Sequence, residues 1–167
     1  MIIRYNLYKE GSYTTDSPLK TRWLAPRDLK YIEYKENTFY KFLGEMIYGN
    51  RCLALIDKGE VLSYLWINEK FIESHGLKEP LKKNEVFLYS AMTKPDQRGK
   101  GYAEILRAKC YEVLRSQGKD TFYSATDIKN KPALKFKEKI GAEKIASYLF
   151  IKFWKFKYLR HDTSSVS

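Results

Sequence analysis

A short segment of the chain, residues 97–102 (Gln-Arg-Gly-Lys-Gly-Tyr), combines two glycines with two basic side chains. Glycines let the backbone approach a ligand closely and aim several N–H groups at one point. Arg98 and Lys100 add full positive charges, and a helix beginning near Gly101 would add the partial charge of its dipole. The segment therefore predicts a site for a phosphate or pyrophosphate. The alternative is an ordinary loop with solvated basic residues.

Two familiar phosphate-binding loops do not match this segment. The chain contains no Gly-x-x-x-x-Gly-Lys-Ser/Thr pattern. In the dinucleotide pattern Gly-x-Gly-x-x-Gly, the third glycine would fall on Glu104. What remains is the spacing Arg98-x-x-Gly101-x-Ala103.

The segment lies between a predicted strand and a predicted helix. Residues 85–93 are apolar in their middle, which is typical of a strand buried on both faces. Residues 103–116 carry an apolar helical face, and Gly118 caps that helix. The other predicted elements are a strand (2–8), a helix (26–48), a hairpin (51–56 and 60–68), a polar connection (71–84), a strand (121–126), a helix (130–140) and a strand-like stretch (146–159). This order predicts a mixed α/β sheet with helices on both faces.

Length and composition indicate one globular domain. With 167 residues, 44% of them hydrophobic, we expect one domain over residues 1–160 and a flexible tail over 161–167. The first residues lack the features of a secretory signal, and no apolar run is long enough to span a bilayer. Cys52 and Cys110 have no metal-ligand spacing. We therefore predict a cytoplasmic protein with no metal and no membrane partner. The net charge of +11 favours ligands that carry phosphates.

Two motifs together make the chain resemble the GNAT (GCN5-related N-acetyltransferase) superfamily. The first is the spacing Arg98-x-x-Gly101-x-Ala103, which is similar to the family's Arg/Gln-x-x-Gly-x-Gly/Ala signature. The second is a set of four residues at family-like spacing: Asn130, Ala133, Phe136 and Gly141. The resemblance covers roughly residues 51–141. It implies a mixed, mostly antiparallel central sheet and transfer of an acetyl group from acetyl-CoA to a primary amine by direct attack.

The resemblance also implies where coenzyme A would bind. Backbone groups near Met92 and Thr93 would pair with the pantetheine arm, where the central strand splays from its neighbour. Asn130 would contact the coenzyme from the next helix. The backbone near Met92 would also polarise the thioester carbonyl. Backbone amides of the glycine-rich segment would hold the pyrophosphate: Arg98, Gly99, Lys100, Gly101, Tyr102 and Ala103.

Direct transfer needs a base for the amine, and Glu85 is our first candidate. It opens the predicted central strand and lies thirteen residues before Arg98. The histone-type members of the family that the chain resembles place their base glutamate at the same offset. Tyr89 and Ser90 are alternatives on the same strand. Glu85 could equally be an exposed glutamate at a strand end.

The leaving thiolate also needs a proton or a stabilising charge. Many relatives have a tyrosine for this purpose directly after the position of Phe136, whereas this chain has Lys137. A lysine there could protonate or stabilise the thiolate, or it could be a solvated helix residue. Tyr111, Tyr123 and Tyr148 are other candidate hydroxyls.

Aromatic residues of the first fifty positions would line the acceptor pocket in such a fold: Trp23, Tyr31, Tyr34, Phe39, Tyr40 and Tyr48. They favour a small or sugar-like amine, such as an amino sugar or a nucleotide-linked amino sugar. A protein or peptide acceptor is the alternative.

The stretch 148–160 alternates aromatic and basic residues without a Gly, Asn or Pro. Either it is one long strand, or it contains a hidden turn like the one that joins the last two strands of the family that the chain resembles. As one long strand, its outer part would pair with a second subunit, giving a homodimer, or cover the edge of its own sheet. Its composition also suits nucleic-acid binding, the runner-up function. We do not expect a nucleic-acid partner, because an RNP-type signature is absent and the basic residues are dispersed.

Overall fold

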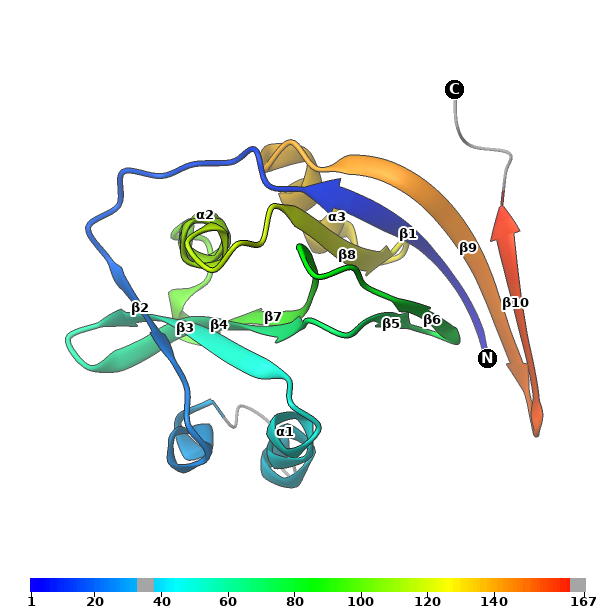
Figure 1. Ribbon diagram of the computed structural model, residues 1–167, viewed down its shortest axis with the longest axis horizontal. Coiled ribbons are helices and arrows are strands. Elements are labelled where there is room, and N and C mark those ends of the chain that lie inside the picture. The colour runs from blue at the N-terminus through cyan, green and yellow to red at the C-terminus, as the bar shows by residue number, and fades with distance from the viewer. Residues whose placement is uncertain (33–37, 163–167) are drawn as a thin grey trace.

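The computed structural model describes residues 1–32 and 38–162 of the chain. An eight-stranded sheet with the strand order β10-β9-β1-β8-β7-β4-β3-β2 forms its centre. Helix α1 and the 3₁₀ helix η1 lie on one side of this sheet, and α2 and α3 lie on the other (Figure 1). The elements are β1 (Ile2–Glu10), β2 (Lys20–Trp23), η1 (Pro26–Tyr31), α1 (Thr38–Ile47), β3 (Arg51–Asp57), β4 (Glu60–Asn68), β5 (Phe71–Ser74), β6 (Leu77–Pro80), β7 (Glu85–Thr93), the 3₁₀ helix η2 (Pro95–Gln97), α2 (Tyr102–Arg115), β8 (Thr121–Asp127), α3 (Lys131–Lys139), β9 (Glu143–Phe153) and β10 (Phe156–Asp162).

The predicted fold class is confirmed. The sheet is mixed, and its neighbouring strands are antiparallel except for β7 and β8, which run parallel. None of the described helices has the length and apolar character of a membrane span.

Two apolar clusters hold helices to the two faces of the sheet. Leu106, Cys110 and Leu114 of α2 pack on β3, β4 and β7 on one face. On the other face, Phe42 of α1 packs against Trp66 of β4, with ring centroids 5.4 Å apart. Because β4 is buried on both faces, it forms the rigid centre to which β7 is attached.

Strand β7 changes direction at a bulge and then leaves its parallel neighbour. Tyr64 pairs with Met92 and Trp66 pairs with Tyr89, so two residues of β7 lie opposite one residue of β4. Ser90, in the bulge, has a φ of 48°. The pairing of β7 with β8 covers only residues 85–87 and 121–123. Beyond those residues the two strands diverge, and they open a space between them.

Two predicted elements differ from the structure. The helix predicted over residues 26–48 is wrong, because η1 covers Pro26–Tyr31 and α1 begins only at Thr38. The side chain of Asp28 accepts hydrogen bonds from the Ala25 N–H and from Arg22, and these contacts tie η1 to the end of β2. Residues 33–37 lie outside the described part of the chain.

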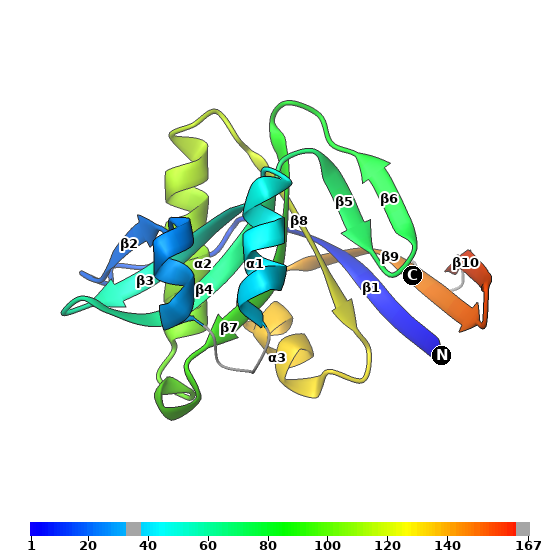
Figure 2. The same ribbon diagram turned by 90° about the horizontal axis from the view of Figure 1, so that it is seen from below.

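The predicted polar connection over residues 71–84 contains a hairpin, β5–β6, which lies beside β7 and β1 in two views (Figures 1 and 2). Ile72 and Leu77 are its buried residues, and they pack with Tyr5 and Phe87. Each of these two strands is short and buries one apolar side chain. The alternation of apolar and polar residues that indicates a strand is therefore too brief to be recognised in the sequence.

Of the two alternatives for the aromatic stretch 146–159, the structure has the hidden turn, because the stretch forms parts of two strands, β9 and β10. A two-residue loop, Trp154-Lys155, joins β9 to β10, since Phe153 pairs with Phe156. Trp154 adopts a left-handed φ of 51° without the glycine or asparagine that such loops favour. Strand β10 extends to Asp162, two residues beyond the expected end of the domain at residue 160. Residues 163–167 lie outside the described part of the chain.

Candidate active site

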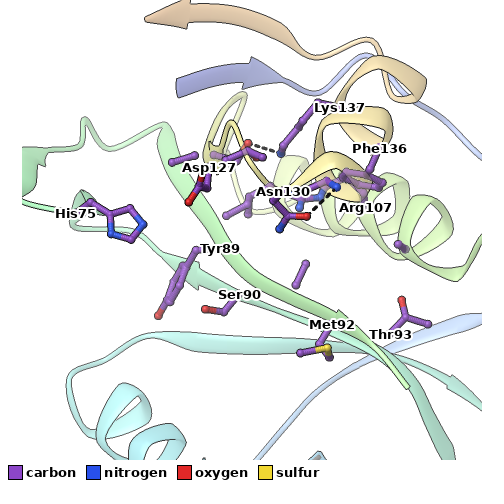
Figure 3. A pocket seen from close by; sticks show the side chains of 17 residues that line it. His75, Tyr89, Ser90, Met92, Thr93, Arg107, Asp127, Asn130, Phe136 and Lys137 are labelled. Atoms are coloured by element: carbon purple, nitrogen blue, oxygen red, sulfur yellow. Dashed lines mark hydrogen bonds between the residues drawn. The ribbon is translucent and has the colours of Figure 1, made fainter. Parts of the chain in front are cut away.

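A cavity of about 430 Å³ lies where β7 and β8 diverge (Figure 3). Its walls come from residues 88–93 of β7, residues 124–127 of β8, and the facing sides of α2 and α3. His75, in the turn between β5 and β6, lines the end nearest that hairpin. The space therefore runs through the sheet, with α3 at one side and the β5–β6 turn at the other.

Four of the predicted coenzyme-binding residues line this cavity: Met92, Thr93, Ala103 and Asn130. Asn130 also caps α3, because its Oδ1 accepts a hydrogen bond from the Ala133 N–H at 3.2 Å. Its carboxamide therefore has a structural use beside any contact with a ligand.

The other five predicted coenzyme-binding residues do not line the cavity: Arg98, Gly99, Lys100, Gly101 and Tyr102. They form the loop and the first turn at the N-terminus of α2, next to Thr93 and Ala103. Gly99 and Gly101 both have a φ of 78°, and nothing lies within 4 Å of where a Cβ would stand on either. The loop thus presents an open glycine backbone at a helix N-terminus, an arrangement that fits a pyrophosphate.

Lys137 lines the cavity from α3 and is buried (Figure 3). Its Nζ donates hydrogen bonds to Glu10 Oε1 at 2.9 Å and to the Ser124 hydroxyl. Burial and then the positive charge of Arg107 lower the pKa of Lys137 to about 8, although Glu10 acts in the opposite direction. The ammonium group is therefore poised to release a proton near neutral pH.

Glu10, at the end of β1, contacts both Lys137 and Arg107. It accepts a hydrogen bond from the Tyr111 hydroxyl at 2.6 Å, and Arg107 Nη1 lies 3.4 Å from its Oε1. Burial alone would raise the pKa of Glu10, but Arg107 and Lys137 outweigh it and bring the pKa down to about 2. Two buried cations thus share one carboxylate at the wall of the cavity.

Sequence reasoning missed Glu10 and Arg107. The predicted first strand ended at residue 8, before Glu10. Arg107 follows Leu106 on the buried side of α2. Because a charged residue is rarely buried without a partner, its position could have indicated a buried group of opposite charge. Nε of Arg107 is buried without a hydrogen-bond partner among the described residues.

Glu85 does not line the cavity. It lies at the end of β7 that is still paired with β8, opposite Thr121. Its carboxylate accepts hydrogen bonds from the Lys82 N–H at 2.8 Å and from the Tyr123 hydroxyl at 3.3 Å. These contacts hold the turn that leads into β7.

Both alternatives to Glu85, Tyr89 and Ser90, line the cavity beside the bulge. The Tyr89 hydroxyl donates a hydrogen bond to Glu45 Oε2 of α1 at 2.7 Å. Asn50 Nδ2 donates to the same oxygen at 2.6 Å. Burial, and then the hydrogen bond to Glu45, raise the pKa of the Tyr89 hydroxyl far above its ordinary value.

The three tyrosines considered as proton donors do not line the cavity: Tyr111, Tyr123 and Tyr148. Of the predicted acceptor-pocket aromatics, Tyr31, Tyr40 and Tyr48 are exposed, and Phe39 packs in the cluster under α1. Trp23 stacks on Arg51, whose guanidinium carbon is 4.1 Å from the ring centroid. Tyr34 lies outside the described residues.

Among the described residues, no three His, Cys, Asp or Glu side chains gather closely enough to hold a metal ion. Cys52 and Cys110 are buried free thiols. Burial raises the pKa of both thiols, so neither has the character of a nucleophile.

The diverging strands, the cavity between them and the open glycine loop define a mixed α/β protein with a candidate ligand site in its sheet. The chain matches the family model of the acetyltransferase (GNAT) family over residues 18–142. It therefore belongs to that family. A search of curated proteins by sequence found no match.

Solved structures share the fold at low sequence identity. A GNAT-family acetyltransferase from Colwellia psychrerythraea has a TM-score of 0.65 at 14% identity, over 89% of this chain and 55% of that one. A protein assigned to the same family from Novosphingobium aromaticivorans has a TM-score of 0.63 at 13% identity, over 89% and 63%. An aminoglycoside N-acetyltransferase solved in complex with CoA has a TM-score of 0.57 at 17% identity, over 82% and 98%. The chain thus spans between half and two thirds of the length of the first two structures.

Proposed function

We propose that this chain transfers an acetyl group from acetyl-CoA to a primary amine of a small molecule. The observation that carries the proposal is the divergence of β7 from β8, which opens a cavity beside the glycine loop in a chain of the GNAT family. In the reaction the amine nitrogen attacks the thioester carbonyl, the C–S bond breaks, and the thiolate leaves.

Coenzyme A would lie along the loop and enter the space between the strands. Amides of residues 98–103 would hold the pyrophosphate, and two features support this: the open Cβ positions at Gly99 and Gly101 and the helix N-terminus behind them. Backbone groups of Met92 and Thr93 would pair with the pantetheine arm, because the edge of β7 that faces β8 is free of strand pairing there. Asn130 would contact the coenzyme from the start of α3.

Lys137 would donate the proton that the leaving thiolate needs. It lines the cavity, and its pKa of about 8 is close to that of an ordinary thiol, about 8.5, so proton transfer between them is nearly thermoneutral. Arg107, buried beside it, adds a second positive charge toward the same developing anion.

The acceptor is an amine that reaches the cavity from the side of α1 and the β5–β6 turn. An amino sugar, free or nucleotide-linked, fits the proposal, and the aminoglycoside acetyltransferase among the structural neighbours supports that class. A cavity of about 430 Å³ is within the ordinary range for small-molecule sites.

A thermal-shift titration with acetyl-CoA and CoA tests the coenzyme site. We expect stabilisation that rises with ligand concentration in the wild type and is lost in Gly101→Glu, whose side chain would fill the loop with negative charge. Gly59→Glu is the matched control, because Gly59 has a similar left-handed φ of 84° and equally open space, but lies in the β3–β4 turn. Stabilisation by oligonucleotides with steep salt dependence, and none by CoA, would favour the nucleic-acid alternative instead.

A further inference from the structure

The cavity has protonatable groups on both faces of the sheet. Lys137 approaches it from the α3 face, where it is tied to Glu10. Tyr89 approaches it from the opposite face, where its ring packs in the cluster under α1 and its hydroxyl is tied to Glu45. In Figure 3, Lys137 and Tyr89 lie on opposite sides of the β7 ribbon. The inference below rests on the proposed function.

An acyl transfer that passes through the sheet needs different chemistry at these two faces. The coenzyme loop and Lys137 lie on the side of α2 and α3, so the thiolate departs toward that side. The amine must then arrive from the side of α1, where it meets Tyr89 and the bulge at Ser90. A group that takes a proton from the amine has to lie on this second face.

We propose that Tyr89 and Glu45 remove the proton from the acceptor amine, with Tyr89 as the relay and Glu45 as the final acceptor. Tyr89 is the only tyrosine among the described residues that lines the cavity. Its hydrogen bond to Glu45 Oε2, 2.7 Å long, joins the cavity to α1. Glu45 is half-buried, so the proton it receives can pass on to solvent.

The proton count balances in one concerted step. The amine nitrogen forms its bond to the carbonyl carbon, and its N–H proton moves to the Tyr89 oxygen. At the same time the Tyr89 proton moves to Glu45 Oε2, so the phenol stays neutral throughout. On the other face the thiolate takes a proton from Lys137. Glu45 and Lys137 then return to their starting states by exchange with water.

The surroundings of Tyr89 favour a relay over a free base. Burial and the contact with Glu45 hold its hydroxyl protonated, so Tyr89 cannot act as a phenolate near neutral pH. Cys52 and Glu73 are the other titratable groups that act on it, and both further oppose a negative charge there. Asn50 holds the accepting oxygen of Glu45 in place through its side-chain amide.

The test measures release of the CoA thiol with glucosamine, neamine and spermidine as acceptors, at a series of pH values. We expect Tyr89→Phe and Glu45→Gln each to lower kcat/KM for a turned-over amine by about 10²-fold. We also expect kcat/KM to rise with pH. In both variants the midpoint of this rise should move toward the pKa of the free amine. Glu45→Asp should recover part of the loss, which a merely structural role would not predict.

Glu138→Gln is the matched control, because Glu138 is an exposed glutamate that does not line the cavity. Stabilisation by CoA should be unchanged in every variant, which shows that each is folded and binds the coenzyme. Wild-type rates and pH profiles in Tyr89→Phe and Glu45→Gln would overturn the inference while leaving the proposed function intact. Absence of thiol release by the wild type with all three amines would overturn the proposed function, and the inference with it.

Discussion

At the scale of single residues, Glu10 explains how Lys137, the proposed proton donor, can be buried inside the protein. A lysine buried alone would lose its charge, but the carboxylate 2.9 Å away keeps the ammonium form accessible. Arg107 acts in the opposite sense and limits how far Glu10 can raise the pKa of Lys137. The pKa of about 8 is therefore the outcome of burial and two opposed neighbours.

Replacing Lys137 with methionine tests its proposed role. We expect kcat to fall by about 10²-fold, because the thiolate loses its proton donor. A donor must be protonated, so kcat of the wild type should fall as the pH rises above about 8, and this limb should disappear in Lys137→Met. Lys135→Met, at an exposed position of the same helix, is the control. A falling limb that persists in Lys137→Met would assign the proton donor elsewhere.

At the scale of elements, the sequence predicted β7, the glycine loop and α2 because each has a long, regular signal. The resemblance to the family implied that the central strand splays from its neighbour near Met92, but the residues alone did not predict the cavity. Its walls depend on where β7 and β8 stop pairing and on a bulge formed by Ser90. Glu45 and Tyr89 are far apart in sequence, and only the packing of α1 on the sheet brings them together. The turn at Trp154-Lys155 was hidden because neither residue is typical of a tight turn.

The β9–β10 turn gives a prediction about stability. A tryptophan in the left-handed region is strained by about 1–2 kcal/mol, and glycine is not. Trp154 is 79% exposed, so its removal gives up little packing. We therefore expect Trp154→Gly to raise the free energy of unfolding by about 1 kcal/mol in denaturant titrations. Lys155→Gly should bring no gain, because Lys155 does not have a positive φ.

At the scale of the whole molecule, Glu10 joins β1 to α2 and α3 through its contacts with Arg107, Tyr111 and Lys137. Its pKa is lowered from 4.5 to about 2 on folding. The stability that it contributes is therefore fully present above pH 4.5 and is lost as the pH falls toward 2. That shift corresponds to on the order of 3 kcal/mol.

Glu10→Gln tests this linkage across the molecule. At neutral pH we expect a loss of about 3–5 kcal/mol, because two buried cations lose their counter-charge. Between pH 4.5 and 2 the stability of the variant should change less steeply than that of the wild type. Urea unfolding at several pH values measures both effects. Equal pH dependence in the two proteins would show that Glu10 is not the linked group.

The position of β1 has a consequence for the order in which the protein is made. Its hydrogen-bonded neighbours are β8 and β9, which are synthesised more than a hundred residues later. At about 5–20 residues per second, Tyr5, Leu7 and Glu10 wait several seconds on the ribosome before their partners exist. During that wait, the part of the sheet made of β3, β4 and β7 can form with α1 packed on it. The ion cluster around Lys137 cannot form yet. The cavity is therefore completed only when β1 is inserted between β8 and β9, two strands that are made after it.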